Sequence, residues 1–197
     1  MSQPTGTPLR CGAVILAGGT AARMGGVDKA SVELGGVSLL ERALAATIAA
    51  VEVVVVGTEV PATRPVTWTR EDPVGGGPAA GLLAGLDRFR GRPDVVIVLA
   101  VDMPKIEAGT VARLTWAVEK DDAADGACLV DPGGRRQPLA AAYRSASLLA
   151  ARPAAREDEH GLSMRTLTSG LVLVEVPSIG RESRDVDTWA DLRDLGD

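Results

Sequence analysis

The sequence is poor in aromatic residues, cysteine and histidine. Its 197 residues include three tryptophans, one tyrosine, one phenylalanine, two cysteines and one histidine, although 46% of them are hydrophobic. Much of the hydrophobic fraction is Ala and Val, so we expect a core of small aliphatic side chains at contacts between helices and a sheet. This length suits one α/β domain and leaves no room for two.

The two cysteines, Cys11 and Cys128, are far apart, and neither belongs to a Cys-x-x-Cys motif. This spacing favours free thiols in a reducing compartment over a disulfide or a metal site. Residues 1–10 are polar and rich in Pro and Gly, without the apolar stretch of a signal peptide. We therefore predict a disordered tail at 1–11, one folded domain at 12–197 and a cytoplasmic location.

No apolar run is long enough to cross a bilayer. The longest runs, such as 95–101, fall far short of the ~20 residues that a membrane helix needs. The formal net charge of −5 gives no bulk attraction for nucleic acid or for an anionic membrane. We therefore expect neither nucleic acid nor a membrane as a partner.

Several common catalytic patterns are also missing. The single histidine, His160, lies in the polar stretch 156–161, where a solvated loop residue is favoured over a catalytic one. Without a G-x-S-x-G elbow, this argues against a Ser-His-Asp hydrolase. Neither GxGxxG nor GxxxxGK[ST] occurs, which weakens the dinucleotide-binding and Walker interpretations.

Strand and helix patterns alternate along the chain. Ser38 and Glu41 form a capping-box pattern ahead of a helix that is predicted to extend to Ala50. The most apolar of the predicted strands, at 94–101, should be central and buried. The other predicted strands lie at 12–17, 51–56, 66–69, 127–130, 139–143 and 171–176, and the other predicted helices begin near 77, 107, 145, 163 and 189. This alternation predicts a single-domain, Rossmann-like α/β fold with an open, mostly parallel twisted sheet and helices on both faces.

The glycine-rich loop after the first strand is the first functional candidate. Gly18 and Gly19 lack a Cβ, so their backbone amides can approach an anion closely. Arg23 and Lys29 add two cations to the same loop. Two Gly-Gly pairs and two cations suit a triphosphate, and the alternative is a surface loop whose cations are merely solvated.

Acidic residues form the second candidate. Asp102 ends the most apolar strand, and ligands of open parallel sheets bind beyond the carboxyl ends of the strands. Mg²⁺ takes oxygen ligands, typically one or two carboxylates plus phosphate and water, so we predict Asp102 as its ligand. Asp185 and Asp187 have the i, i+2 spacing that points side chains the same way on an extended segment, and Asp187 can complete the metal site. The alternatives are a turn cap by Asp102 and a helix N-cap by Asp187 or Thr188.

Together these segments resemble the MobA-like nucleotidyltransferases, the family of molybdenum cofactor guanylyltransferase. The similar segments keep their order over nearly the whole chain: LAGGTAARMGGVDK at 16–29, EDP at 71–73, GPAAGLLAGL at 77–86, LAVDMP at 99–104, GRRQPL at 134–139 and DVDTWADL at 185–192. Gln137 stands where the family has His, and the family's Asn after the second strand has no counterpart at Gly57-Thr58.

The resemblance implies a nucleotide-diphospho-sugar-transferase-like fold and a set of site residues. Arg23, Lys29 and Asp102 are implied as catalytic, with Asp102 also binding Mg²⁺. The implied nucleotide contacts are Leu16, Ala17, Gly18, Gly19, Lys29, Asp72, Gly77 and Gly81.

The implied reaction transfers GMP from GTP to the molybdopterin cofactor, with release of pyrophosphate. Two alternatives stay open. One is a related enzyme that uses CTP or another nucleoside triphosphate with a different phosphorylated acceptor. The other is a non-catalytic nucleotide-binding module that regulates a partner.

Overall fold

A seven-stranded sheet organises the protein, for which a computed structural model describes residues 9–18 and 26–196. The strand order is β5-β4-β1-β6-β8-β7-β9. All neighbouring pairs are parallel except those that β8 makes with β6 and β7. The strands are β1 (Cys11–Leu16), β4 (Glu52–Val56), β5 (Thr67–Thr69), β6 (Val95–Ala100), β7 (Gly126–Val130), β8 (Arg136–Arg144) and β9 (Leu173–Pro177).

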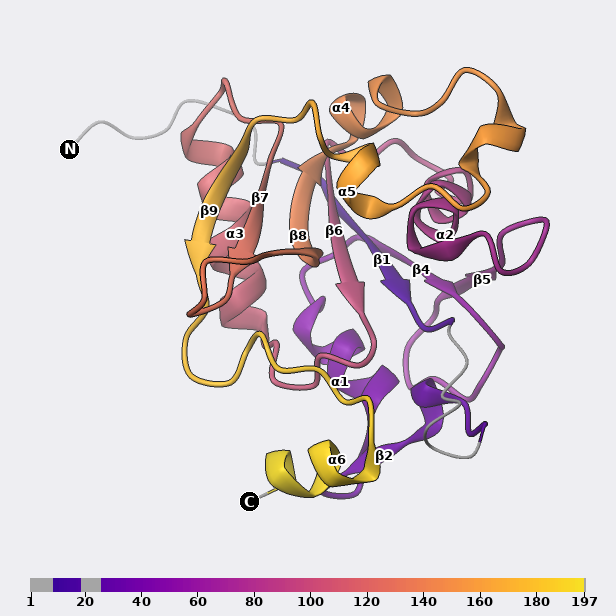
Figure 1. The fold of residues 1–197 in the computed structure, drawn as a ribbon, viewed down its shortest axis with the longest axis vertical. Helices are drawn as coiled ribbons and strands as arrows, with labels where there is room; N and C mark the ends of the chain where they lie inside the picture. The colour runs from indigo at the N-terminus through magenta and orange to yellow at the C-terminus, as the bar shows by residue number, and fades with distance from the viewer. Residues whose placement is uncertain (1–8, 19–25, 197) are drawn as a thin grey trace.

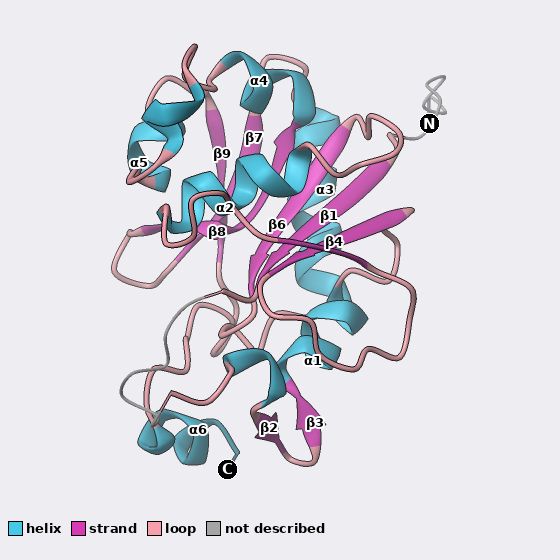
Figure 2. Ribbon diagram, turned by 90° about the vertical axis from the view of Figure 1, so that its right-hand side faces the viewer, coloured by secondary structure: helices cyan, strands magenta, loops and turns pink. Residues whose placement is uncertain are grey.

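Helices cover both faces of this sheet (Figures 1 and 2). One face carries α1 (Leu39–Ala46) and α3 (Ala108–Lys120), and the other carries α2 (Gly77–Leu86), α4 (Ser145–Ala150) and α5 (Met164–Leu167). Side chains along β1 alternate between these layers, with Ala13 and Ile15 in one hydrophobic cluster and Val14 and Leu16 in the other. No helix in residues 9–18 and 26–196 is long and apolar enough to cross a membrane.

The structure confirms the predicted fold class, including a central position for β6, the fourth strand of seven. The antiparallel direction of β8 follows from a tight turn after β7. There Asp131 Oδ1 accepts hydrogen bonds from the backbone amides of Gly133 and Arg135, at 2.9 Å each, and reverses the chain. Cys11 and Cys128 are free thiols, as predicted.

The first strand begins one residue earlier than the sequence indicated. Strand β1 begins at Cys11, and the backbone amide of Arg10 donates to Asp94 Oδ2 at 2.8 Å. Residues 1–8 of the predicted tail lie outside the described residues.

Helix α1 is shorter than predicted and only half of its capping box forms. Ser38 Oγ accepts from the Glu41 amide as expected, but the Glu41 carboxylate accepts from the Thr63 amide at 2.8 Å instead of returning to Ser38. The helix ends at Ala46 rather than Ala50, and the Arg64 guanidinium then binds carbonyl oxygens of the last turn, including that of Leu44. Hydrogen bonds to residues outside the helix therefore replace the local hydrogen bonds on which the prediction depended.

A small hairpin, β2 (Glu33–Leu34) and β3 (Val37–Ser38), was not predicted from the sequence. Its turn is Gly35-Gly36, and both glycines have positive φ, 62° and 78°, as a two-residue hairpin turn requires. The C-terminal helix α6 (Trp189–Gly196) packs against β2, beyond the carboxyl ends of the parallel strands (Figure 2). The Gly-Gly pair between short apolar stretches was the available signal.

Helix α2 lies unusually close to the sheet because it contains glycines. A Cβ at Gly85 would be 2.7 Å from Val14 Cγ1, and a Cβ at Gly81 would be 3.4 Å from both Leu16 Cδ2 and Val56 Cγ1. These glycines therefore allow a close contact between the helix and the sheet.

We expect Gly85→Ala to destabilise the protein, because its methyl group would overlap the stiff, buried side chain of Val14. The expected loss is about 1–3 kcal/mol, typical of overpacking in a core. Gly109→Ala is the matched control, since nothing lies within 4 Å of a Cβ there and alanine favours a helix by up to ~1 kcal/mol. Urea unfolding of both variants measures the difference, and equal stabilities would contradict the packing argument.

Candidate active site

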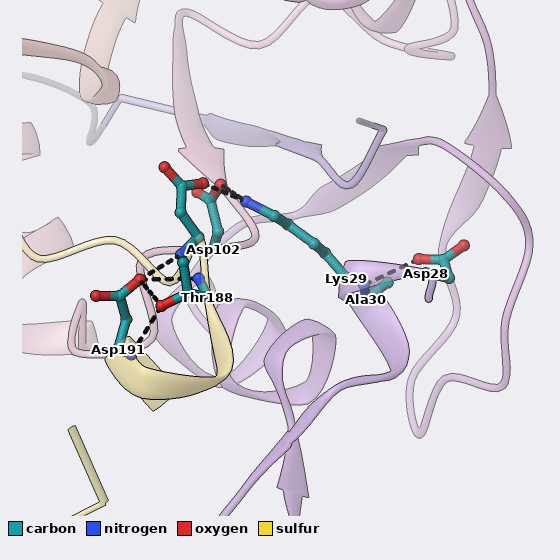
Figure 3. Close-up of polar contacts among 7 residues, drawn as sticks. Asp28, Lys29, Ala30, Asp102, Thr188 and Asp191 are labelled. Carbon is teal, nitrogen blue, oxygen red and sulfur yellow. Dashed lines mark hydrogen bonds and ion pairs between the residues drawn. The ribbon is translucent and has the colours of Figure 1, made fainter. Parts of the chain in front are cut away.

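Three predicted site residues from distant parts of the chain meet beyond the carboxyl ends of β1 and β6, and Figure 3 labels two of them, Lys29 and Asp102. Lys29 Nζ lies 2.8 Å from Asp102 Oδ2 and 2.8 Å from Asp187 Oδ1. The two carboxylates therefore converge on a single ammonium group. This contact joins the glycine-rich loop, the central strand and the C-terminal segment.

Lys29 is positioned by a short 3₁₀ helix, η2 (Lys29–Ser31). Asp28 caps this helix, because its Oδ1 accepts from the Ala30 amide at 2.9 Å, and the Ala30 side chain is fully buried (Figure 3). The cap and the buried alanine fix the backbone on both sides of Lys29. Its side chain, only 13% exposed, then extends toward the carboxylates.

Asp102 is held by backbone pairing on both sides. The Val101 amide donates to the Leu16 carbonyl at 3.0 Å, which keeps the end of β6 beside β1. The Val186 amide donates to the Asp102 carbonyl at 2.8 Å, and the Val186 side chain is completely buried in the core. Burial of Val186 thus places the next residue, Asp187, at the site.

Helix α6 is capped by Thr188 rather than by Asp187. The Thr188 amide and hydroxyl both donate to Asp191 Oδ2, and the Asp191 amide donates back to Thr188 Oγ1 at 3.2 Å (Figure 3). The Asp187 carboxylate is thereby available to Lys29. Asp185, although spaced i, i+2 from Asp187, is exposed, and Lys29 pairs with Asp187 instead.

The two carboxylates set the protonation of Lys29. Burial alone would lower the pKa of Lys29, but hydrogen bonds to Asp102 and then Asp187 outweigh burial and raise its pKa above the ordinary value. Lys29 is therefore a full positive charge throughout the neutral range.

The donor set suits a hard divalent cation. Two carboxylate oxygens already face one cation, and Mg²⁺ commonly takes one or two carboxylates, with phosphates and water completing its octahedron. Within residues 9–18 and 26–196, no group of three His, Cys, Asp or Glu side chains is arranged to hold a metal. Among the described residues Asp102 and Asp187 would thus supply two carboxylate ligands, and phosphate oxygens and water suit the remaining positions.

The end of β1 is tightly built against β4. The amides of Ala17 and Gly18 both donate to the Val56 carbonyl, at 2.8 and 2.9 Å. We expected the Gly18 amide to face an anion, but it is directed at the Val56 carbonyl instead. The residue itself is exposed. Gly19 and Arg23, the other predicted phosphate contacts of this loop, lie outside the described residues.

Gly57, one of the departures from the family pattern, packs closely against the end of β1. A Cβ there would lie 3.0 Å from the Ala17 carbonyl carbon and 3.0 Å from the Gly18 nitrogen, so a side chain would not fit. The next residue, Thr58, accepts a hydrogen bond from Arg70 through its hydroxyl group. Gln137, the other departure, donates from Nε2 to Asp131 Oδ2 at 3.2 Å.

The connection between β5 and α2 reveals a residue that the sequence analysis missed. Glu71 Oε1 accepts from the Gly75 amide at 3.1 Å, and its Oε2 lies 3.9 Å from where a Cβ of Gly81 would be. Asp72, the predicted nucleotide contact, is exposed, as is Val74 at the tip of this connection. The signal for Glu71 was its place beside Asp72 in the same short motif.

A cavity of about 220 Å³ opens beside this connection. Glu71, Asp72 and His160 are among its lining residues. His160 is exposed, as predicted, with its Nδ1 3.2 Å from the position of a Cβ at Gly76. Gly77, which begins α2, has a φ of 88° that favours glycine.

Comparison with known proteins agrees with this geometry. Residues 13–171 match the model of the MobA-like NTP transferase domain. The chain is 33% identical over 136 residues to a molybdenum cofactor guanylyltransferase of Shewanella sp. strain ANA-3, covering 66% of this chain and 67% of that protein. A molybdenum cofactor guanylyltransferase of Rhodopseudomonas palustris is 37% identical over 142 residues, 66% of this chain and 65% of the relative.

Solved structures share the fold over almost the whole chain. A nucleotidyl transferase from Methanothermobacter has a TM-score of 0.74 at 22% identity, covering 94% of this chain and 95% of the other. Molybdopterin-guanine dinucleotide biosynthesis protein A from Archaeoglobus fulgidus has a TM-score of 0.69 at 20% identity, covering 93% and 96%. The protein is thus a nucleotidyltransferase. It belongs to the MobA-like NTP transferase domain family.

Proposed function

We propose that this nucleotidyltransferase transfers GMP from GTP to a molybdopterin-type phosphorylated acceptor and releases pyrophosphate, with Mg²⁺ held by Asp102 and Asp187. The observation that carries the proposal is the convergence of Lys29, Asp102 and Asp187 at the carboxyl ends of β1 and β6. Support for guanine and for the acceptor comes from the guanylyltransferases to which the chain is similar.

The site's groups suit an in-line displacement at phosphorus. A phosphate oxygen of the acceptor forms a bond to the α-phosphorus of GTP while the bond from that phosphorus to the bridging oxygen of the β-phosphate breaks. The nucleophile is already anionic near neutral pH, so the reaction needs no general base. Bound Mg²⁺ would neutralise charge on the phosphate oxygens, and this is the chemistry that the metal supplies.

The remaining work belongs to positioning and charge. Lys29, and with it Arg23, would bind the triphosphate and neutralise charge that develops on the leaving pyrophosphate. Asp102 and Asp187 would align the α-phosphate through the metal. The end of β1 at Leu16, Ala17 and Gly18, with Gly19, would border the nucleotide.

A carboxylate between β5 and α2 would select the base. Guanine presents two donors, N1–H and the N2 amino group, and an acidic group can accept from both. We propose Asp72 for nucleotide contact and Glu71 as a second acid, which lies beside Gly81 of α2, the helix that Gly77 begins. The matching edge of adenine offers an acceptor, so a carboxylate covered by the bound base would lose a partner, at a cost of ~1–3 kcal/mol.

The proposal predicts GTP-dependent transfer. The purified protein, Mg²⁺ and a molybdopterin-type acceptor are incubated with each labelled triphosphate, and both pyrophosphate and the labelled dinucleotide product are measured. We expect turnover with GTP and roughly 5- to 150-fold less with ATP, in line with ~1–3 kcal/mol of discrimination.

Each other outcome of this panel points to a different reaction. Turnover with CTP but not GTP would assign the protein to cytidylyl transfer. If none of the triphosphates supports turnover with this acceptor, molybdopterin is refuted as the acceptor. Other phosphorylated acceptors would then be compared.

A further inference from the structure

The ammonium group of Lys29 lies where a divalent cation would have to bind. Its Nζ is 2.8 Å from one oxygen of Asp102 and 2.8 Å from one oxygen of Asp187. These are the carboxylates that we propose as metal ligands, and no cluster of three metal-binding side chains offers another site in the described part of the chain. Lys29 and a metal ion therefore compete for the same two carboxylates.

We propose that Lys29 occupies the metal site of the nucleotide-free protein, and that a nucleoside triphosphate opens this site by taking Lys29 onto its phosphates. This inference rests on the proposed function, but it concerns the binding of metal and nucleotide rather than the chemical step. It predicts that metal alone binds weakly and that the two ligands bind with positive coupling.

The cost of displacing Lys29 follows from its surroundings. Its side chain is only 13% exposed, and η2 holds its backbone through the Asp28 cap. An ammonium group that leaves both carboxylates without finding another anion keeps the cost of burial and loses its ion pairs. A divalent ion that binds while Lys29 stays in place meets a like charge at short range.

A triphosphate removes both costs. Its oxygens give Lys29 new charge-assisted hydrogen bonds, and others complete the coordination of the metal that Asp102 and Asp187 provide only in part. Exchange of partners then leaves every charge paired. Because coupling between two ligands is reciprocal, the metal strengthens nucleotide binding by the same factor.

Removal of Lys29 should therefore strengthen metal binding, the opposite of what loss of a binding residue usually does. Mn²⁺ serves as the probe, titrated by calorimetry and by the EPR signal of the free ion into the full chain without nucleotide. We expect Lys29→Ala to bind Mn²⁺ roughly 5- to 150-fold more tightly than the unmodified protein, the usual range of coupling between sites. Lys29→Gln, which keeps most of the side-chain length, should show the same direction.

Two controls separate this effect from a general change of charge. Lys120→Ala removes the same charge from α3, where the ammonium lies 5.9 Å from the Trp116 ring, and should leave Mn²⁺ affinity unchanged. Adding Asp102→Ala to Lys29→Ala should abolish the gain, because it removes one of the two carboxylates.

The proposal fails if folded Lys29→Ala and Lys29→Gln bind Mn²⁺ no more tightly than the unmodified protein. It also fails if Lys120→Ala gains as much, or if the gain survives Asp102→Ala. None of these titrations involves turnover. A gain in Mn²⁺ affinity without transfer from any triphosphate would refute the proposed reaction alone, and transfer without the gain would refute the role of Lys29 alone.

Discussion

Asp102→Ala should reduce metal-dependent turnover by roughly a hundredfold or more, as loss of a group that stabilises charge in a transition state does. The side chain supplies one of the two carboxylates that converge on Lys29, so the metal would keep only Asp187 from the described residues. The fold should survive, because Asp102 binds Val186 through its backbone carbonyl, which alanine retains. Pyrophosphate release measures turnover, and circular dichroism checks the fold.

Asp185→Ala is the matched control for this loss of activity. It removes an acidic side chain of the same size from the same C-terminal segment, but one that is exposed and does not pair with Lys29. We expect turnover close to that of the unmodified protein. Normal turnover of Asp102→Ala, or an equal loss in Asp185→Ala, would show that the metal is not held at Asp102.

The sequence predicted the central strand and the residues at its end well, because local sequence patterns determine both. The apolar run of β6 identifies a central strand, and the rule that ligands bind at carboxyl ends of parallel strands then singles out Asp102. Lys29 and Asp187 came from residue type, spacing and family resemblance. In the structure all three side chains are in contact. The distances between them could not be predicted from local sequence patterns.

What the sequence did not reveal depends on tertiary contacts. In the sequence Glu41 completes a capping-box pattern, yet in the structure its carboxylate binds Thr63, which lies 22 residues away. The Gly18 amide is free to bind an anion in an isolated loop, whereas in the sheet it donates to Val56. In each case a polar group with a local partner finds a distant one, and sequence spacing alone cannot rank the two.

The contacts that anchor the C-terminal segment also join residues distant in sequence, so they could not be predicted from spacing. Residues 178–188 connect β9 to α6 and pass beside Asp102, and we call this segment the C-terminal strap. Glu182 is the strap's buried acid, 9% exposed, and its carboxylate accepts from the Thr110 hydroxyl, from Arg113 and, at 2.7 Å, from the Ile179 amide. Neither Glu182 nor Arg113 belongs to a recognisable motif, so only the structure identifies this anchor.

Glu182→Gln should lower the free energy of unfolding by about 3 kcal/mol, near the lower end of what breaking a buried ion pair costs. The amide cannot accept from Arg113 at both positions, so a buried guanidinium donor loses its partner. Arg113 is itself 33% exposed, and water there limits the loss. Urea unfolding at neutral pH measures it, and Glu175→Gln is the control. Glu175 pairs with Arg136 at 2.9 Å on the surface, where such pairs contribute about 0–1 kcal/mol.

The pH dependence separates loss of the ion pair from a general packing defect. Burial alone would raise the pKa of Glu182, but hydrogen bonds from Arg113, Thr110 and Ile179 outweigh burial and hold its pKa below the ordinary value. A lowered carboxyl pKa contributes stability that is fully present above the unfolded-state pKa of about 4.3 and is lost as the pH falls through the folded-state pKa. The difference in unfolding free energy between the unmodified protein and Glu182→Gln should therefore stay constant from about pH 8 to pH 5 and shrink below about pH 4. A difference that is the same at acidic and neutral pH would show that the glutamine disturbs packing, and that the carboxylate charge does not anchor the strap.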